Sequence, residues 1–273
     1  MPVILGGNTG IYLASLTPAV DPDAQAFITA AAITDPTQQA AINTLVVDLK
    51  GYNIWSKMKA LYPFVGGTAS AHKFNLKNPL DTDAAFRLVF NGGWTHSANG
   101  ALPNGTNAYA DTKLLSATSL STNSSHLAAY SRTSTTNSSD CLMGNYEGDG
   151  IGAHRIHQDE PGFYRCENAQ VYNNAGFNYS FHSGFFINSR ITGSQYKTYR
   201  NSSIISTKNL STISFASAVK KIFLAAVNGQ FGVSGYSQRQ IAFSSIGDGL
   251  TDTEAANFYT AVQAFQVALS RNI

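Results

Sequence analysis

The chain has 273 residues, of which 43% are hydrophobic, 11% aromatic and only 12% charged, and its formal net charge is +2. This length and hydrophobic content suffice for one large buried core, so the composition excludes a disordered chain. The charged share is about half of the roughly 25% found in ordinary globular domains. Because Lys and Arg form no basic stripe, nucleic-acid binding is not expected.

The number of cysteines and the lack of long apolar runs indicate the cellular compartment in which the protein is expected. Cys141 and Cys166 are too few for a disulfide framework and lie in no C-x-x-C or His-rich motif. We therefore expect free, partly buried thiols, as in a protein assembled in a reducing cytoplasm. The segment Met1–Gly7 has no basic residue before a long apolar stretch, so no secretory signal is expected. No window approaches the ~20 apolar residues of a membrane-spanning helix, so membrane insertion is not expected.

The N-terminal part of the chain divides into an arm and a helical segment. Residues 1–20 are Gly-rich and apolar without a helical period, and we interpret them as an arm for attachment or oligomer contact. Residues 21–60 are predicted to be helical, because Asp21-Pro22 and Asp35-Pro36 each place a capping acid before a proline at the first helical position. Gln38 stands where its side chain can bond back to the second cap.

The second of these helices is amphipathic. Its apolar residues recur at the i, i+3, i+4, i+7 spacing of one buried face: Ile42, Leu45, Val46 and Leu49. Gly51 stands where a left-handed residue would end the helix. We expect this helix to pack on the body of the protein.

From about residue 61 to residue 246 the sequence shows short alternating runs separated by Gly, Asn, Ser and Pro, which is typical of antiparallel strands. Phe86, Leu88 and Phe90 are predicted to face one way, with Arg87 and Val89 facing the other. Further strands are predicted at His126–Arg132, Gly152–His157, Phe163–Glu167, Gly184–Ser189, Gln195–Tyr199 and Ile222–Val227. Tyr199–Ser202 is predicted to form a hairpin, since Asn201 tolerates positive φ. About ten such strands indicate a sandwich or a barrel.

The last element is a helix. Thr251 and Glu254 form a capping-box pattern, in which each side chain can bond to the other residue's backbone amide. One apolar face then follows to about Ser270, made of Phe258, Val262, Phe265 and Leu269. We expect this face to close over a β-domain that spans residues 61–273.

Six segments of the sequence belong to one pattern: residues 26–31 (AFITAA), 35–46 (DPTQQAAINTLV), 54–67 (IWSKMKALYPFVGG), 86–96 (FRLVFNGGWTH), 103–107 (PNGTN) and 242–256 (AFSSIGDGLTDTEAA). Together they resemble a module of bacteriophage virion proteins. The resemblance covers roughly residues 22 to 273. The modules are similar to concanavalin A-like lectin/glucanase domains and occur in tail, fibre and head-decoration proteins of phages.

The resemblance implies a mostly β fold, a concanavalin A-like jelly-roll β-sandwich with an N-terminal helical segment and a C-terminal helix. It also implies a structural virion component, assembled in the host bacterial cytoplasm, with other virion proteins as partners. We expect a homo-oligomer, for which a trimer is the first candidate. The family has no well-defined set of catalytic or sugar-binding residues, so none is transferred to this chain.

The sequence does not favour an enzyme. Glucanases of this sandwich type carry alternating carboxylates on one strand, about 5.5 Å apart, and this sequence has no Glu-x-Asp-x-Glu run. The nearest patterns, Asp81/Asp83, Glu147/Asp149 and Asp159/Glu160, fit turn-forming acids better. No cofactor is expected, although Asp140, Glu147 and Asp149 form an acidic segment that could hold Ca²⁺ in a loop.

A sugar site needs an aromatic face and planar polar partners on loops held by a rigid scaffold. Trp94, His96, Tyr109 and Asp111 lie in a Gly/Asn-rich stretch, and Tyr146 is a further candidate. These five residues are the predicted carbohydrate-binding set, with cell-surface or mucus polysaccharide as the ligand. Two alternatives stay open: a dedicated receptor-binding lectin module, and a glycan hydrolase.

Overall fold

The computed structural model describes residues 19–134, 139–148, 152–160, 163–170, 176–180, 182–209 and 220–273. Most of the predicted N-terminal arm lies outside the described residues. Within the described residues, no helix is long and apolar enough to span a membrane.

Three long helices form near the two ends of the chain. They are α1 (Pro22–Ala30), α2 (Pro36–Gly51) and α5 (Asp252–Ala268), with shorter elements α3 (Ala69–His72), α4 (Ser116–Ser119), η1 (Trp55–Lys57) and η2 (Asp83–Ala85). The predicted N-caps are confirmed: the side chains of Asp21 and Asp35 accept backbone amides, and Thr251 and Glu254 form a capping box.

Two details of the predicted helical segment are wrong. Gly51 belongs to the last turn of α2, and the left-handed residue after the helix is Asn53, with φ 59°. Asn tolerates this conformation because its short polar side chain can bond locally. The Gln38 side chain accepts the Gly66 amide at 2.7 Å instead of bonding back to its own cap.

The strands form two sheets. The eight-stranded sheet has the order β13 (Ser203–Asn209), β12 (Gln195–Arg200), β11 (Gly184–Thr192), β6 (Ser125–Ser131), β17 (Ile241–Gly247), β4 (Gly100–Pro103) and β3 (Trp94–Ser97), and β1 (Met58–Tyr62) also pairs with β17. The nine-stranded sheet has the order β10 (Phe177–Asn178), β9 (Phe163–Gln170), β8 (Ala153–Glu160), β7 (Asp140–Tyr146), β14 (Lys221–Leu224), β5 (Tyr109–Leu115) and β2 (Val89–Asn91). A short hairpin, β15 (Val227–Gly229) and β16 (Gly232–Ser234), joins this sheet through β7.

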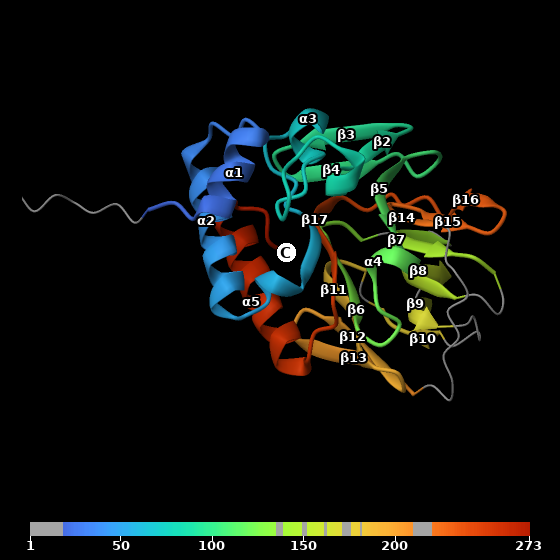
Figure 1. The fold of residues 1–273 in the computed structure, drawn as a ribbon. Helices are drawn as coiled ribbons and strands as arrows, with labels where there is room; N and C mark the ends of the chain where they lie inside the picture. The colour runs from blue at the N-terminus through green and yellow to red at the C-terminus, as the bar shows by residue number, and fades with distance from the viewer. Residues whose placement is uncertain are drawn as a thin grey trace, which may run out of the picture.

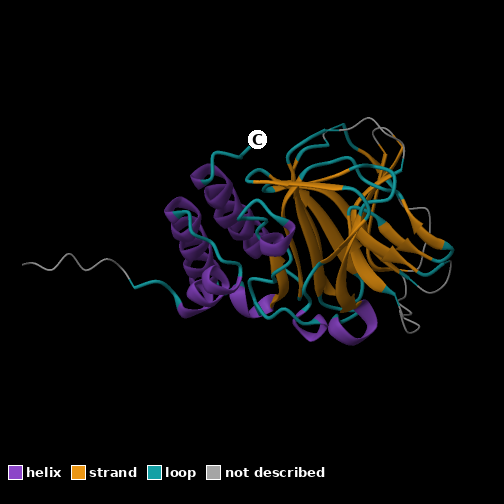
Figure 2. Ribbon diagram, turned by 90° about the horizontal axis from the view of Figure 1, so that it is seen from above, coloured by secondary structure: helices purple, strands orange, loops and turns teal. Residues whose placement is uncertain are grey.

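The molecule has three layers, with the eight-stranded sheet in the middle. Helices α1, α2 and α5 lie together on one side of the strands (Figures 1 and 2). Along β6, Ala128 and Tyr130 belong to the core under the helices, whereas Leu127 and Ala129 belong to the core between the sheets. This alternation follows from the period of two in a strand.

The predicted fold class is confirmed: the protein is mostly β, a jelly-roll β-sandwich with a helical segment before it and a helix after it. The predicted hairpin is confirmed as well, because β12 and β13 pair through Arg200 and Ser203 and Asn201 has φ 55°. The strand predicted around Phe86 is shorter than expected. Phe86 is left-handed, with φ 58°, and β2 begins only at Val89.

A fully buried ion pair links the two sheets. The guanidinium Nε of Arg239, just before β17, donates to Asp140 at the start of β7 at 2.8 Å, and neither side chain has exposed surface. Ser237 donates to the same carboxylate at 2.7 Å. Arg239 Nη1 also reaches the hydroxyl of Tyr164 in the core between the sheets. The pair therefore fixes how β17 and β7 lie across the sandwich.

Removing one partner of this pair is expected to destabilise the fold strongly. Arg239→Met leaves the Asp140 carboxylate buried without its counter-charge, which should cost about 3–5 kcal/mol in the free energy of unfolding. The double variant Asp140→Asn/Arg239→Met should lose less than the single variant. Urea unfolding measures both, with Lys197→Met as the control, because the Lys197–Asp252 pair is partly exposed and should contribute less than about 1 kcal/mol. Equal losses in Arg239→Met and Lys197→Met would contradict this expectation.

Candidate functional site

The nine-stranded sheet has an inner face in the sandwich and an outer face turned away from it. Ile156, Cys166 and Leu224 belong to the core between the sheets. Their strand neighbours therefore point to the outer face. Arg155 and Glu167 lie directly opposite each other on β8 and β9.

One part of this outer face carries an aromatic pair. Tyr109 of β5 and Phe223 of β14 stack with ring centroids 4.6 Å apart and planes 18° from parallel. Asp111, on the same face, is 3.1 Å from the Lys113 ammonium and 3.6 Å from that of Lys221. The carboxylate of Asp111 is thus held between two cations.

A second part of the face is built around Arg155. Its Nε donates to Glu167 at 2.5 Å, and both side chains are buried. The Tyr146 ring covers this guanidinium at 5.1 Å, in a cation–π contact. Gly144 permits the arrangement, because a Cβ there would lie 2.4 Å from the Cβ of Arg155. The buried ion pair below therefore holds Tyr146 in place.

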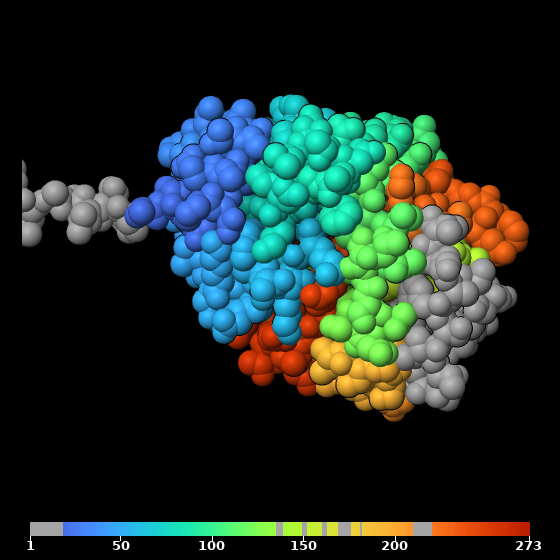
Figure 3. All heavy atoms as spheres, in the orientation of Figure 1, coloured from blue at the N-terminus to red at the C-terminus, as the bar shows by residue number. Residues whose placement is uncertain are grey.

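The β15–β16 hairpin projects beside Tyr146. Gly229 pairs with Gly232, which leaves Gln230 and Phe231 as the two-residue tip. Phe231 is 96% exposed. The hairpin lies at the edge of the molecule, on the side away from α1, α2 and α5 (Figures 1 and 3). A hollow of about 200 Å³ is lined by Tyr146, Gly229, Gln230, Phe231, Gly232, Val233 and Ser234.

The amide of Gln230 lies against the backbone of Gly148. A Cβ on Gly148 would be 2.6 Å from Gln230 Oε1, and Gly148 has φ +108°, which other residues rarely adopt. The backbone conformation therefore favours glycine here, and a side chain at this position would displace the flexible end of Gln230. Gln230 is exposed and lines the hollow, with its amide beside Gly148.

The structure divides the predicted carbohydrate-binding residues into two groups. Tyr109, Asp111 and Tyr146 lie on the outer face of the nine-stranded sheet. Trp94 and His96 instead pack around Phe90, at centroid distances of 5.3 and 4.6 Å, and Phe90 contacts the core between the sheets. The five residues do not form one surface, so we take only Tyr146 into the candidate site.

Sequence reasoning missed Gln230, Phe231 and Gly148. The segment Gly229-Gln230-Phe231-Gly232 does carry a local signal, since two residues between glycines are compatible with a two-residue hairpin. The exposure of Phe231 and the approach of Gly148 depend on how the hairpin joins β7. No local pattern indicates that junction.

The acidic residues considered for catalysis and described by the structure form ion pairs or hydrogen bonds with other residues. Asp81 and Asp83 both bind Arg87, at 2.9 and 3.0 Å. Asp159 binds Arg165 at 2.8 Å, and Glu147 accepts the Lys220 amide at 2.5 Å. Asp149 and the Glu160 side chain lie outside the described residues.

The acidic segment considered for Ca²⁺ is not a loop. Residues 140–146 form strand β7, so Asp140 and Glu147 stand at opposite ends of it, roughly 20 Å apart at the usual strand rise. In the described part of the chain, no group of three or more His, Cys, Asp or Glu residues could hold a metal ion.

The two cysteines are buried free thiols. Cys141 lies opposite His157, whereas Cys166 lies opposite Ile156, the next residue along β8. Adjacent residues of a strand point to opposite faces, so the two thiols lie on different faces of the sheet. Burial raises the pKa of both, that of Cys166 to about 12.

Most of the histidines are buried and kept neutral. Burial lowers the pKa of His72 from 6.5 to about 3, and its Nδ1 lies 2.9 Å from that of His96. Burial likewise lowers the pKa of His126 to about 4 and those of His154 and His157 to about 3. These side chains contribute to the interior and are poor candidates for proton transfer near neutral pH.

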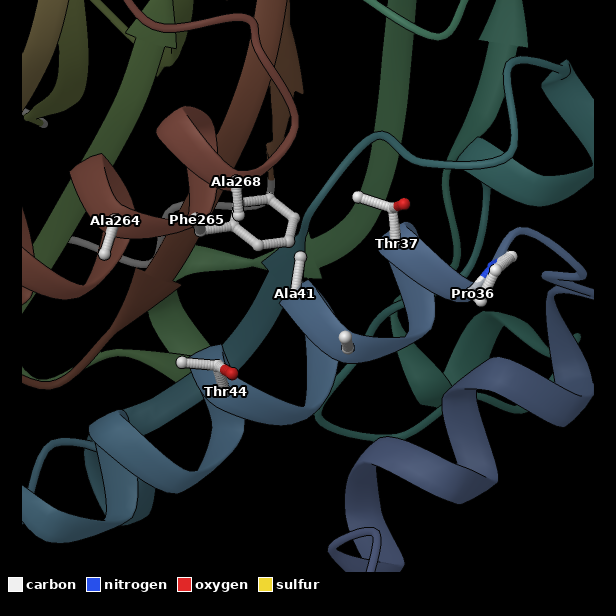
Figure 4. A pocket seen from close by; sticks show the side chains of 8 residues that line it. Pro36, Thr37, Ala41, Thr44, Ala264, Phe265 and Ala268 are labelled. Atoms are coloured by element: carbon white, nitrogen blue, oxygen red, sulfur yellow. The ribbon is translucent and has the colours of Figure 1, made fainter. Parts of the chain in front are cut away.

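A larger hollow, of about 470 Å³, lies between α2 and α5. Small side chains from the two helices face each other across it (Figure 4); it is lined by Pro36, Thr37, Ala40, Ala41, Thr44, Ala264, Phe265 and Ala268. Its only side-chain hydrogen-bonding groups are the hydroxyls of Thr37 and Thr44, and nothing in the structure shows what covers it. We therefore place the candidate site at the hairpin.

No family model matches the chain, and no curated protein matches it. Among solved structures, the binding domain of botulinum neurotoxin serotype D is similar, with a TM-score of 0.50 and 11% identity over 76% of this chain and 52% of that one. The chain thus spans about half of that structure. At this identity the likeness shows the fold alone, a β-sandwich.

Two sialidase structures are more distantly similar. The CBM40 of the Ruminococcus gnavus IT-sialidase has a TM-score of 0.39 and 17% identity over 49% of this chain and 80% of that one. The NanB sialidase from Streptococcus pneumoniae has a TM-score of 0.41 and 16% identity over 62% of this chain and 27% of that one. We base no argument on either likeness.

The buried histidines predict acid sensitivity. Their folded-state pKa values lie below the unfolded value of about 6.5, so between these values the unfolded chain binds more protons. The free energy of unfolding should be largest above pH 6.5 and fall as the pH drops towards 4. Urea unfolding at pH 7.5, 6 and 5 measures this fall.

The variant His72→Gln should reduce that slope by up to about 1.4 kcal/mol per pH unit, the contribution of one proton. His182→Gln is the control, because His182 is less buried and its pKa is lowered less. Parallel curves for the wild type and His72→Gln would refute the assignment.

Proposed function

We propose that this chain is a non-catalytic glycan-recognition module whose binding site is the hollow between Tyr146 and the β15–β16 hairpin. The observation that carries the proposal is Phe231, an aromatic residue 96% exposed on a hairpin tip that belongs to the lining of the same hollow as Tyr146. An exposed aromatic ring gains free energy when the apolar C–H face of a sugar covers it.

The Tyr146 side of the site is rigid. Tyr146 ends a strand and rests on Arg155, which the buried carboxylate of Glu167 holds. The hairpin is paired along its short length and joined to β7. Because Tyr146 is held before binding, little of its side-chain freedom has to be lost when a ligand arrives, whereas the exposed Phe231 ring would be ordered by the ligand itself.

The carboxylates of the outer face fit a protein that binds glycans better than they fit a glycosidase. A glycosidase needs two carboxyl groups across one sugar bond, one of them free to carry a proton. Asp111 lies between two lysines, and Glu167 binds Arg155. Neither carboxylate belongs to the lining of the hollow.

We further propose that the module is a structural component of a bacteriophage virion, a head or tail fibre or decoration protein assembled in the host cytoplasm. The resemblance of residues 22–273 to phage virion modules supports this setting. The arrangement of the layers also supports it, because the described chain enters at α1 and the hairpin lies on the other side of the molecule (Figure 1). An N-terminal attachment to other virion proteins, in a homo-oligomer such as a trimer, would then turn the hairpin towards cell-surface or mucus polysaccharide.

The site assignment predicts which variants lose binding. Phe231→Ala and Tyr146→Ala should each weaken glycan binding about tenfold or more, because each removes one aromatic wall, whereas Tyr146→Phe should bind almost normally. Isothermal titration against ligands selected on a glycan array measures the affinities. Tyr52→Ala is the matched control, since Tyr52 is a partly exposed aromatic residue at the end of α2. Wild-type affinity in both alanine variants would overturn the site.

The virion proposal predicts an oriented protein in purified particles. The chain should co-purify with particles, and a maleimide reagent should label Phe231→Cys but not Val47→Cys on the helical side. Both native thiols are buried, so background labelling should be low, and both chosen positions are exposed in the isolated chain. Absence of the chain from particles, or equal labelling of the two variants, would contradict the proposal.

A further inference from the structure

We infer that the hollow beside Tyr146 selects a neutral sugar that presents two adjacent hydroxyl groups, and that it discriminates against anionic sugars. This inference rests on the proposed glycan-binding function of the same hollow. It concerns the chemical class of the ligand, which three features of the site determine.

The first feature is the lining. Its seven residues are Tyr146, Gly229, Gln230, Phe231, Gly232, Val233 and Ser234, and none of them is a Lys, Arg, His, Asp or Glu. Recognition of a carboxylate or sulfate relies on a cation, most often an arginine that offers two parallel N–H donors. The lining offers no such group.

The second feature is that Arg155, a cation close to the hollow, is already engaged. Arg155 lies beneath the Tyr146 ring and donates to Glu167, and the two side chains are only 5% and 1% exposed. An anionic ligand would have to replace Glu167 in a buried pair, which leaves that carboxylate buried without its counter-charge. The ion pair therefore supports Tyr146 without attracting an anion.

The third feature is the primary amide of Gln230, an exposed side chain in the lining of the hollow. The Gly148 backbone lies against it, with a hypothetical Cβ at 2.6 Å from Oε1 and 2.9 Å from Nε2. A primary amide presents an acceptor oxygen and a donor nitrogen side by side. Two adjacent hydroxyl groups of a sugar ring present the complementary pair, one donating and one accepting.

The size of the hollow fits one ring. Its volume of about 200 Å³ is comparable with that of a single monosaccharide. Phe231 and Tyr146 provide apolar surface for the C–H face of that ring, and Gln230 lies at the rim, where the hydroxyl groups would be. We therefore expect a terminal sugar unit rather than the interior of a chain.

The test compares neutral oligosaccharides with sialylated and uronic acid-containing versions of the same cores, titrated against the intact chain at low and at physiological salt. A preference of at least about fivefold for the neutral members supports the inference. Equal or tighter binding of the anionic members overturns the inference and leaves the proposed function intact. Failure to bind any member overturns both.

Variants separate the amide from the rest of the site. Gln230→Ala should weaken binding of the preferred neutral ligand about fivefold or more, the contribution of its lost hydrogen bonds. Gly148→Ala should have a similar effect, because it displaces an amide that is still present. Gln25→Ala, at an exposed glutamine of α1, is the matched control. If Gln230→Ala stays folded by circular dichroism and binds like the wild type, the amide has no role and the inference is wrong.

Discussion

The burial of both faces of the central strands of the eight-stranded sheet is the constraint on which the rest of the structure depends. Every residue of β6 and β17 is buried, with helices on one side and the second sheet on the other. Polar side chains in these strands must therefore find partners inside. His126 meets the Asp248 carbonyl and Ser245, and the Ser244 hydroxyl donates to the Ala128 carbonyl. These two strands therefore have no free face, and the proposed recognition site lies on the other sheet.

Some of the few charged side chains of the protein lie in its interior. Asp140 and Arg239 join the sheets, and Arg155 and Glu167 support Tyr146. Arg271 has no acidic partner within the described residues, but its guanidinium donates to backbone carbonyls, including those of Pro63, Phe64 and Ala242. Burial lowers its pKa to about 9. Part of the small set of charged residues thus fixes the packing of the interior.

The features that could be predicted from the sequence are those set by neighbouring residues. Capping by Asp21, Asp35 and Thr251 involves backbone amides within three positions, and the Asn201 turn needs only one tolerant residue. The side to which the Trp94 ring points could not be predicted from neighbouring residues in this way. Its ring packs against Phe90 and its Nε1 donates to the Asn91 carbonyl, contacts that depend on how the chain turns between β2 and β3. The two sheets then place Trp94 and Tyr109 on different surfaces.

The tip of the β15–β16 hairpin belongs to neither core. Gly229 and Gly232 close the pairing on either side, and only Gln230 and Phe231 extend beyond it. Neither residue takes part in the strand pairing, the helices or the buried ion pairs. If the proposed site is correct, the residues that set the fold are separate from the two at the tip that would contact the ligand, so evolution could change ligand preference at these two positions with little effect on stability.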